Sequence, residues 1–299
     1  MVLPEKVTLS DAIELAAIAM GKSLSEKDLG KQFFPSQDMA DVEADLHDAL
    51  ELARSRQAAC PASYPFEVTD RSIRFNRLDG FNPYAFLLLG RSLNFGGPVD
   101  CECMLDRFRD RFEDLVCWAM RKFGFAAEVL SIPRGPRGLN TKLAPALREI
   151  AVRFREPAVL REDLLMPHDN DLDVDVLGVP IIGNGDRGGW PVFQIQCATG
   201  AIGALESKVS EGAANFTTVW EKGFFIGSRI RGAATPDDLL ALHETYWHRL
   251  GQVGWIIDRT RIAYLASGER DIPVPDTVIE LWDQLWAAKD EISWQTGWQ

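Results

Sequence analysis

Two stretches of sequence, Asp171-Leu-Asp-Val-Asp-Val-Leu-Gly178 and Val192-Phe-Gln-Ile-Gln-Cys-Ala198, decide the fold. Apolar residues alternate with aspartates in the first stretch and with glutamines in the second. Since successive side chains of a strand point to opposite faces, this alternation predicts two strands over residues 172–178 and 192–198, each with one buried face. The glycine-rich segment GNGDRGG (183–189) between them predicts a hairpin turn.

The other faces of these two predicted strands carry polar oxygen atoms. Asp171, Asp173 and Asp175 share one face of the first strand, and Gln194 and Gln196 share one face of the second. Three like charges on one strand face repel each other unless water or a cation relieves them. Carboxylate and amide oxygens are hard ligands that suit magnesium or manganese.

Elements predicted on both sides of this hairpin complete an α/β domain over residues 99–299. The sequence predicts helices over residues 104–123, 143–155, 236–250 and 276–294, a further helix holding Lys208, and strands over 126–130 and 254–257. Alternating helices and strands in this order indicate a central mixed sheet flanked by helices.

The region before this domain has a different pattern. Residues 8–57 have apolar residues at helical spacing, with Thr8 or Ser10 as the first cap and Ser36 with Asp38 before the second helix. Two short β-like runs and an apolar helix over 83–93 follow, and the segment NFGGP (94–98) is typical of a linker. We therefore predict a mainly helical N-terminal region over residues 1–98, with a short β-hairpin.

Composition limits the class of protein. The chain has 299 residues, of which 46% are hydrophobic and 25% charged, as is ordinary for a globular protein. It has no apolar run of the roughly 18 residues that a membrane helix needs. The first residues lack a basic leader, and the five cysteines are scattered without metal-site spacing. We expect a soluble, cytoplasmic protein with reduced thiols.

Charge is unevenly distributed along the chain. The formal net charge is −12, yet residues 103–155 hold 11 lysines and arginines against 6 aspartates and glutamates. A basic surface on an acidic body is compatible with binding to nucleic acid. It is equally compatible with a basic partner subunit that supplies much of the affinity.

Three motifs resemble the Mrr-type restriction endonucleases, which belong to the wider PD-(D/E)xK nucleases. Arg111-Phe-Glu-Asp-Leu-Val116, leading to Lys122-Phe-Gly-Phe125, resembles the family's first helix and the turn after it. Asp171-Leu-Asp-Val174 resembles the strand that holds the family's metal-binding aspartate, and Phe193-Gln-Ile-Gln-Cys197 resembles the next strand. The resemblance covers roughly residues 105–210 and implies a restriction-endonuclease-like mixed sheet flanked by helices.

This resemblance assigns a role to each matching residue. Glu113 matches the helical acid, Asp173 the central aspartate and Gln196 the position of a glutamate or glutamine. The lysine position holds Ala198, which departs from the family's pattern. Some members of the superfamily carry that lysine on the following helix, where Lys208 stands in this chain.

The resemblance implies hydrolysis of phosphodiester bonds with the help of Mg²⁺ or Mn²⁺, held by Glu113, Asp173 and Gln196. Lys208 would stabilise the charge that develops on the phosphate. DNA is favoured over RNA as the substrate, and the family's biology suggests a restriction or antiviral defence effector. The sequence is compatible with a protein partner within such a system and with a homo-oligomer, and decides neither.

The Gly/Pro-rich loop and the alanine at position 198 each allow two interpretations. Arg134, Arg137 and Lys142 lie in or beside a Gly/Pro-rich loop, which is either a grip for the phosphate backbone or a solvated connector. Ala198 and the acidic net charge also favour an alternative function, a non-catalytic or partner-activated subunit that uses a decayed nuclease fold for binding.

Overall fold

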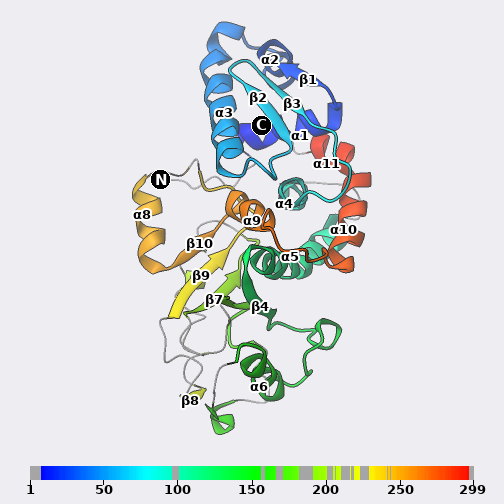
Figure 1. The fold of residues 1–299 in the computed structure, drawn as a ribbon. Coiled ribbons are helices and arrows are strands. Elements are labelled where there is room, and N and C mark those ends of the chain that lie inside the picture. Colours follow the sequence, from blue (N-terminus) through cyan, green and yellow to red (C-terminus); the bar gives the residue numbers. More distant parts are fainter. Residues whose placement is uncertain are drawn as a thin grey trace.

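The protein is a mixed α/β structure in the computed structural model (Figure 1). The described residues are 8–95, 101–155, 159–165, 171–181, 191–200, 205, 207–209, 216, 219–222, 229–240, 242 and 244–295. Within them lie a mixed sheet of five strands, an antiparallel sheet of three strands and a two-stranded pair.

The N-terminal region is mainly helical, as predicted. Its helices are α1 (Leu9–Met20), α2 (Glu26–Phe33), α3 (Met39–Ala59) and α4 (Pro83–Ser92), and its three-stranded sheet has β1 (Ser23–Ser25), β2 (Phe66–Thr69) and β3 (Ser72–Phe75). The Thr8 hydroxyl caps α1 by accepting from the Asp11 amide, and the Asp38 carboxylate caps α3 by accepting from the Ala40 amide. The predicted starts of both helices are confirmed.

The larger sheet has the order β10-β9-β7-β6-β4. Its strands are β4 (Phe125–Val129), β6 (Val176–Pro180), β7 (Val192–Cys197), β9 (Arg229–Ala234) and β10 (Trp255–Ile257). Strands β4, β6 and β7 pair antiparallel, whereas β7, β9 and β10 pair parallel. The predicted mixed sheet and the pairing of the two deciding strands are confirmed, while the turn between them lies outside the described residues.

Two helices cover opposite faces of this sheet. Val176 and Ile195 pack in one core cluster with α5 (Cys101–Phe123). Leu177, the neighbour of Val176 in β6, and Val192, three residues before Ile195 in β7, pack in another cluster with α6 (Leu143–Arg153). The period-two pattern of the sequence thus becomes two separate apolar layers.

The C-terminal helices connect the sheet to the N-terminal region. They are α8 (Glu244–Val253), α9 (Arg259–Ala266), α10 (Asp276–Ala287) and α11 (Lys289–Gln295). Elsewhere in the chain lie the short strands β5 (Val159–Leu160) and β8 (Trp220–Lys222) and the 3-10 helices η1 (Leu93–Phe95), η2 (Gly135–Arg137) and η3 (Glu162–Leu164). Figure 1 shows α5 and α9 between the sheet and the N-terminal helices. One apolar cluster continues from α1 and α4 into α5, α9 and α10. The boundary predicted near residue 98 falls among residues outside the described ranges.

Two predicted helices differ from the structure. The helix predicted over 236–250 begins at Glu244, because the Asp237 and Asp238 side chains instead bind buried arginines. The helix predicted over 276–294 is interrupted at Ala288, where α10 ends and α11 begins.

A buried ion network joins α1, α3 and α9. The Arg56 guanidinium, 1% exposed, contacts Asp11 at 2.8 Å, Glu14 at 2.9 Å and Asp238 at 2.5 Å. Arg259, whose side chain is fully buried, binds Asp11 through both terminal nitrogens at 3.0 Å. Buried charges persist in a fold only when they are paired, so these five residues tie segments that are distant in the sequence.

Among the described residues, no helix is both long enough and apolar enough to span a membrane.

Candidate active site

Glu113 lies on α5 where this helix approaches the end of β4. Its carboxylate accepts a hydrogen bond from the Ser131 hydroxyl and pairs with Arg137 at 3.2 Å. The Glu113 side chain is 18% exposed. Burial, together with the nearby charge of Asp175, raises the pKa of Glu113 to about 8, against the opposing effects of Ser131 and Arg137.

Asp175 is placed directly before β6 by three backbone-linked contacts. Its amide donates to the Ile195 carbonyl at 3.0 Å, and its carbonyl accepts from Leu130 at 2.7 Å. The Cys197 amide donates to its carboxylate at 2.6 Å. Burial raises the pKa of Asp175 to about 6, although the Cys197 amide lowers it. The carboxylate is therefore fixed between β4 and β7.

Asp173 does not have the position that the sequence predicted. Strand β6 begins at Val176, and both Leu172 (φ 57°) and Asp173 (φ 60°) adopt left-handed backbone conformations before it. The Asp173 amide donates to the Asp171 carboxylate at 3.0 Å, as in an Asx turn. The predicted strand over 172–178 is thus wrong in its first residues. Asp173 is exposed, whereas Asp175, directly before β6, is half-buried.

Lys208 lies within electrostatic range of Asp175. Residues 207–209 are helical, and the Lys208 side chain is exposed. The charge of Lys208 lowers the pKa of Asp175, whereas Asp171 and Asp173 raise it. Ala198, at the position of the missing lysine, is buried against the apolar cluster beside β9.

Gln196 is the next residue in β7 after Ile195 and is 7% exposed. Its side-chain oxygen is buried and has no hydrogen-bond partner in the described part of the chain. No hydrogen bond joins the Gln196 side chain to Glu113 or Asp175. A buried amide oxygen without a donor is unfavourable, so this atom is suited to a ligand that accepts its lone pair.

Arg134 and Arg137 hold the loop together in this structure and do not extend from it. Arg134 is 3% exposed and donates to the Leu130 carbonyl at 2.7 Å and the Thr141 carbonyl at 3.0 Å. The Arg137 side chain is 12% exposed and is bound to acidic groups of α5. Both guanidinium groups are thus engaged within the protein, and the two interpretations of this loop, a phosphate grip or a connector, stay predictions. Lys142 is exposed, and its prediction stands.

The residues present fit a divalent cation. Among the residues placed in the structure, no group of three or more His, Cys, Asp and Glu side chains could hold a metal ion. The Glu113 and Asp175 carboxylates nevertheless interact, and both have a raised pKa. A pair of under-compensated carboxylates gains from a nearby positive charge.

Ser131 is absent from the residues that the sequence predicts for this site, and Asp175 is predicted only as one of three acids on the polar face of a strand. The signal for Asp175 was present in the run Val176-Leu-Gly-Val179, since a strand placed on these residues puts Asp175 at its entrance. Ser131 carries no comparable signal, because its role depends on the approach of Glu113 from α5.

Comparison of the chain with protein families, with curated proteins and with solved structures found no match.

Proposed function

We propose that this protein is a metal-dependent nuclease that hydrolyses phosphodiester bonds of nucleic acid. The observation that carries the proposal is the pair Glu113 and Asp175. These two carboxylates interact, and both have a raised pKa, to about 8 and about 6. Perturbed carboxylates are concentrated at functional sites, although structural ion pairs also produce them.

The order of elements supports the same proposal. A helix with an acid, α5, is followed by β4, by β6 with Asp175 at its entrance, by β7 with Gln196, and by the helical residues around Lys208. This order is the one on which the resemblance to Mrr-type restriction endonucleases rests. We infer a restriction-endonuclease-like sheet in which Asp175, not Asp173, is the central aspartate.

Each side chain then has a stated role. Glu113, Asp175 and the Gln196 amide oxygen would hold Mg²⁺ or Mn²⁺, a cation that lowers the pKa of a bound water and offsets phosphate charge. The Cys197 amide fixes the orientation of Asp175. Lys208, near Asp175, would stabilise the negative charge that develops on the phosphate.

DNA remains the favoured substrate, with restriction or antiviral defence as the proposed biological role. Both come from the family resemblance. Ala198 in place of the lysine favours a second function, a non-catalytic or partner-activated subunit that binds through the same fold.

The proposal is tested by incubating the full chain with supercoiled DNA, single-stranded DNA and RNA, in magnesium, manganese or chelator. We expect cleavage that requires the metal and is lost in the double variant Glu113→Gln/Asp175→Asn. Asp106→Asn is the matched control, because Asp106 is an exposed acid on the same helix as Glu113. Absence of cleavage by the wild type with either metal would favour the non-catalytic function.

A further inference from the structure

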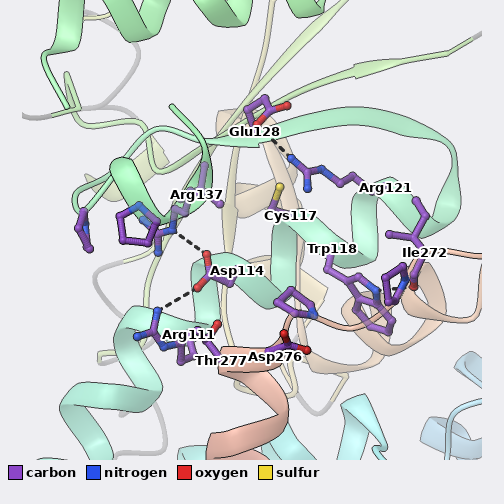
Figure 2. A pocket seen from close by; sticks show the side chains of 15 residues that line it. Arg111, Asp114, Cys117, Trp118, Arg121, Glu128, Arg137, Ile272, Asp276 and Thr277 are labelled. Carbon is purple, nitrogen blue, oxygen red and sulfur yellow. Dashed lines mark hydrogen bonds and ion pairs between the residues drawn. The ribbon is translucent and has the colours of Figure 1, made fainter. Parts of the chain in front are cut away.

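A pocket lies beside the candidate site, on the neighbouring face of α5. Its volume is about 390 Å³, within the range of small-molecule sites. The walls come from α5, from the loop around Pro133 and Pro136, and from residues 272–277 at the start of α10. Figure 2 shows the Arg111, Asp114 and Arg137 side chains on one wall, across from Trp118 and Ile272.

Two of the three carboxylates that line this pocket, those of Asp114 and Glu128, are already bound by arginines. Asp114 accepts from Arg137 at 2.7 Å on one oxygen and from Arg111 at 3.2 Å on the other. Glu128 pairs at 3.0 Å with Arg121, and at the same distance with Arg153 outside the pocket. Asp114 and Glu128 thus each bind two guanidinium groups, and these groups have more N–H donors than the two carboxylates accept.

The guanidinium groups retain N–H donors that point to an acceptor-rich ligand. Among the described residues, Arg111 donates only to Asp114, and a guanidinium can donate five hydrogen bonds. Arg121 donates to the Ala127 carbonyl and pairs with Glu128. The Arg111 and Arg121 side chains are 29% and 40% exposed, so both are accessible. Phosphate and carboxylate groups match such donors.

The rest of the wall is apolar and rigid. Trp118 is held by its indole N–H, which donates to the Ile272 carbonyl at 3.0 Å. Four prolines complete this part of the lining: Pro133, Pro136, Pro273 and Pro275. The one carboxylate without a guanidinium partner here, Asp276, is exposed at the pocket's edge. A flat or apolar ligand body would pack on the indole and the proline rings.

We propose that this pocket binds a phosphate monoester of mononucleotide size, with the phosphate at Arg111 and the base toward Trp118. Arg137, which binds Asp114 in the pocket, also binds Glu113 in the candidate site. A ligand at Arg111 is therefore connected to Glu113 through three ion pairs, Arg111–Asp114, Asp114–Arg137 and Arg137–Glu113. The binding itself does not depend on the proposed nuclease activity.

The test is isothermal titration of the full chain with adenosine 5′-monophosphate in buffer that contains chelator. We expect saturable binding at millimolar concentration or below, and adenosine should bind at least about tenfold more weakly, since a charge-assisted hydrogen bond contributes about 1.5–3 kcal/mol. Inorganic phosphate should bind more weakly than the nucleotide, because it lacks the base. The affinity for a 5′-phosphorylated oligonucleotide is compared with that for adenosine 5′-monophosphate. Tighter binding of the oligonucleotide would identify a strand end as the ligand, and tighter binding of the monophosphate would identify a free nucleotide.

Two variants and one control make this test decisive. Arg111→Gln should weaken nucleotide binding by about tenfold or more. Thr277→Tyr should weaken it by filling the pocket, with every charge left in place. Arg109→Gln should bind like the wild type, because Arg109 is exposed on the same helix, pairs with Asp106 and does not line the pocket.

The outcomes are separable from those of the cleavage assay. Asp175→Asn should bind the nucleotide as the wild type does, even if cleavage is lost. The proposal is overturned if the nucleotide does not bind at millimolar concentration, or if the Arg111→Gln and Arg109→Gln variants, both folded by circular dichroism, bind it equally well.

Discussion

The molecule buries carboxylates in two places and treats them in opposite ways. In the ion network of Asp11, Glu14, Arg56, Asp238 and Arg259, every carboxylate lies against a guanidinium. Burial opposes ionisation of Asp11, yet Arg259 and Arg56 hold its pKa well below its usual range, whereas burial raises the pKa of Glu14 despite the same arginines.

In the candidate site, the effect of burial on the carboxylate pKa is larger than the effect of the neighbouring positive groups. Glu113 and Asp175 keep a raised pKa because burial outweighs the groups that lower it, which are the Ser131 hydroxyl and Arg137 at Glu113 and the Cys197 amide and Lys208 at Asp175. Asp11 differs from Glu113 and Asp175 in the positive charge that surrounds its carboxylate, and not in being buried. Charges that are fully paired stabilise an arrangement, whereas charges left under-compensated are available to bind a cation. We therefore assign a structural role to the first group and a chemical role to the second.

The largest effect on stability is expected from Arg56→Met. Removing one partner of a buried ion pair leaves uncompensated charge in the interior, which costs about 3–5 kcal/mol. Three carboxylates contact Arg56, so the free energy of unfolding should fall by at least that amount. Urea denaturation followed by circular dichroism measures the loss.

Arg54→Met is the matched control for this prediction. Arg54 lies on the same helix, and its ion pair with Asp70 is exposed, with side chains 35% and 75% accessible. Surface pairs contribute about 0–1 kcal/mol. Equal losses in the two variants would contradict the structural role of the ion network.

The contrast between Asp175 and Asp173 tests the candidate site directly. Asp175→Asn should reduce metal-dependent cleavage by on the order of a thousandfold, an effect of the size seen when a buried catalytic group is removed. Asp173→Asn should have a small effect, because Asp173 is exposed in the turn before β6. A large loss in Asp173→Asn together with full activity in Asp175→Asn would restore the assignment made from sequence.

Much of the fold follows from local patterns, and the failures have a physical cause. The helix with Glu113 and the pairing of β6 with β7 are predicted, because periodicity and strand alternation are local properties. Asp173 is misplaced because the run Leu172-Asp-Val-Asp-Val176 fits both a longer strand and a turn followed by a strand. Only the left-handed conformations of Leu172 and Asp173 decide between them.

Roles that depend on long-range packing were not predictable from sequence. Arg134 and Arg137 lie in a loop of glycines and prolines, which is typical of a surface segment, yet they are held against α5 and the end of β4. Asp11 and Glu14 resemble ordinary acids of a surface helix. Their burial depends on Arg259, more than 240 residues away in the chain.

Lys208 should have an intermediate effect on cleavage. Its charge faces Asp175, so Lys208→Ala should lower the rate by about 10- to 100-fold, and Lys208→Arg should restore part of it. Lys142→Ala is the control, since Lys142 is an exposed lysine at the start of α6 and should change substrate affinity more than the maximal rate. Equal maximal rates in the wild type and Lys208→Ala would remove Lys208 from the site.

The smallest effect, and the most specific, concerns the pH dependence of stability. The pKa of Glu113 is raised from 4.5 to about 8, so the folded protein favours the protonated acid. Stability from this group is present at low pH and is lost as pH rises from about 4.5 to about 8. Glu113→Gln mimics the protonated acid and should match the wild type near pH 5. Near pH 8 the variant should unfold at a higher temperature than the wild type, because its free energy of unfolding should be larger by about 1 kcal/mol or somewhat more. Calorimetry across this range measures the difference, and magnesium should reduce it by stabilising only the wild type. A difference that does not change with pH would mean that Glu113 is compensated like the acids of the ion network, and the contrast between the two regions would then be lost.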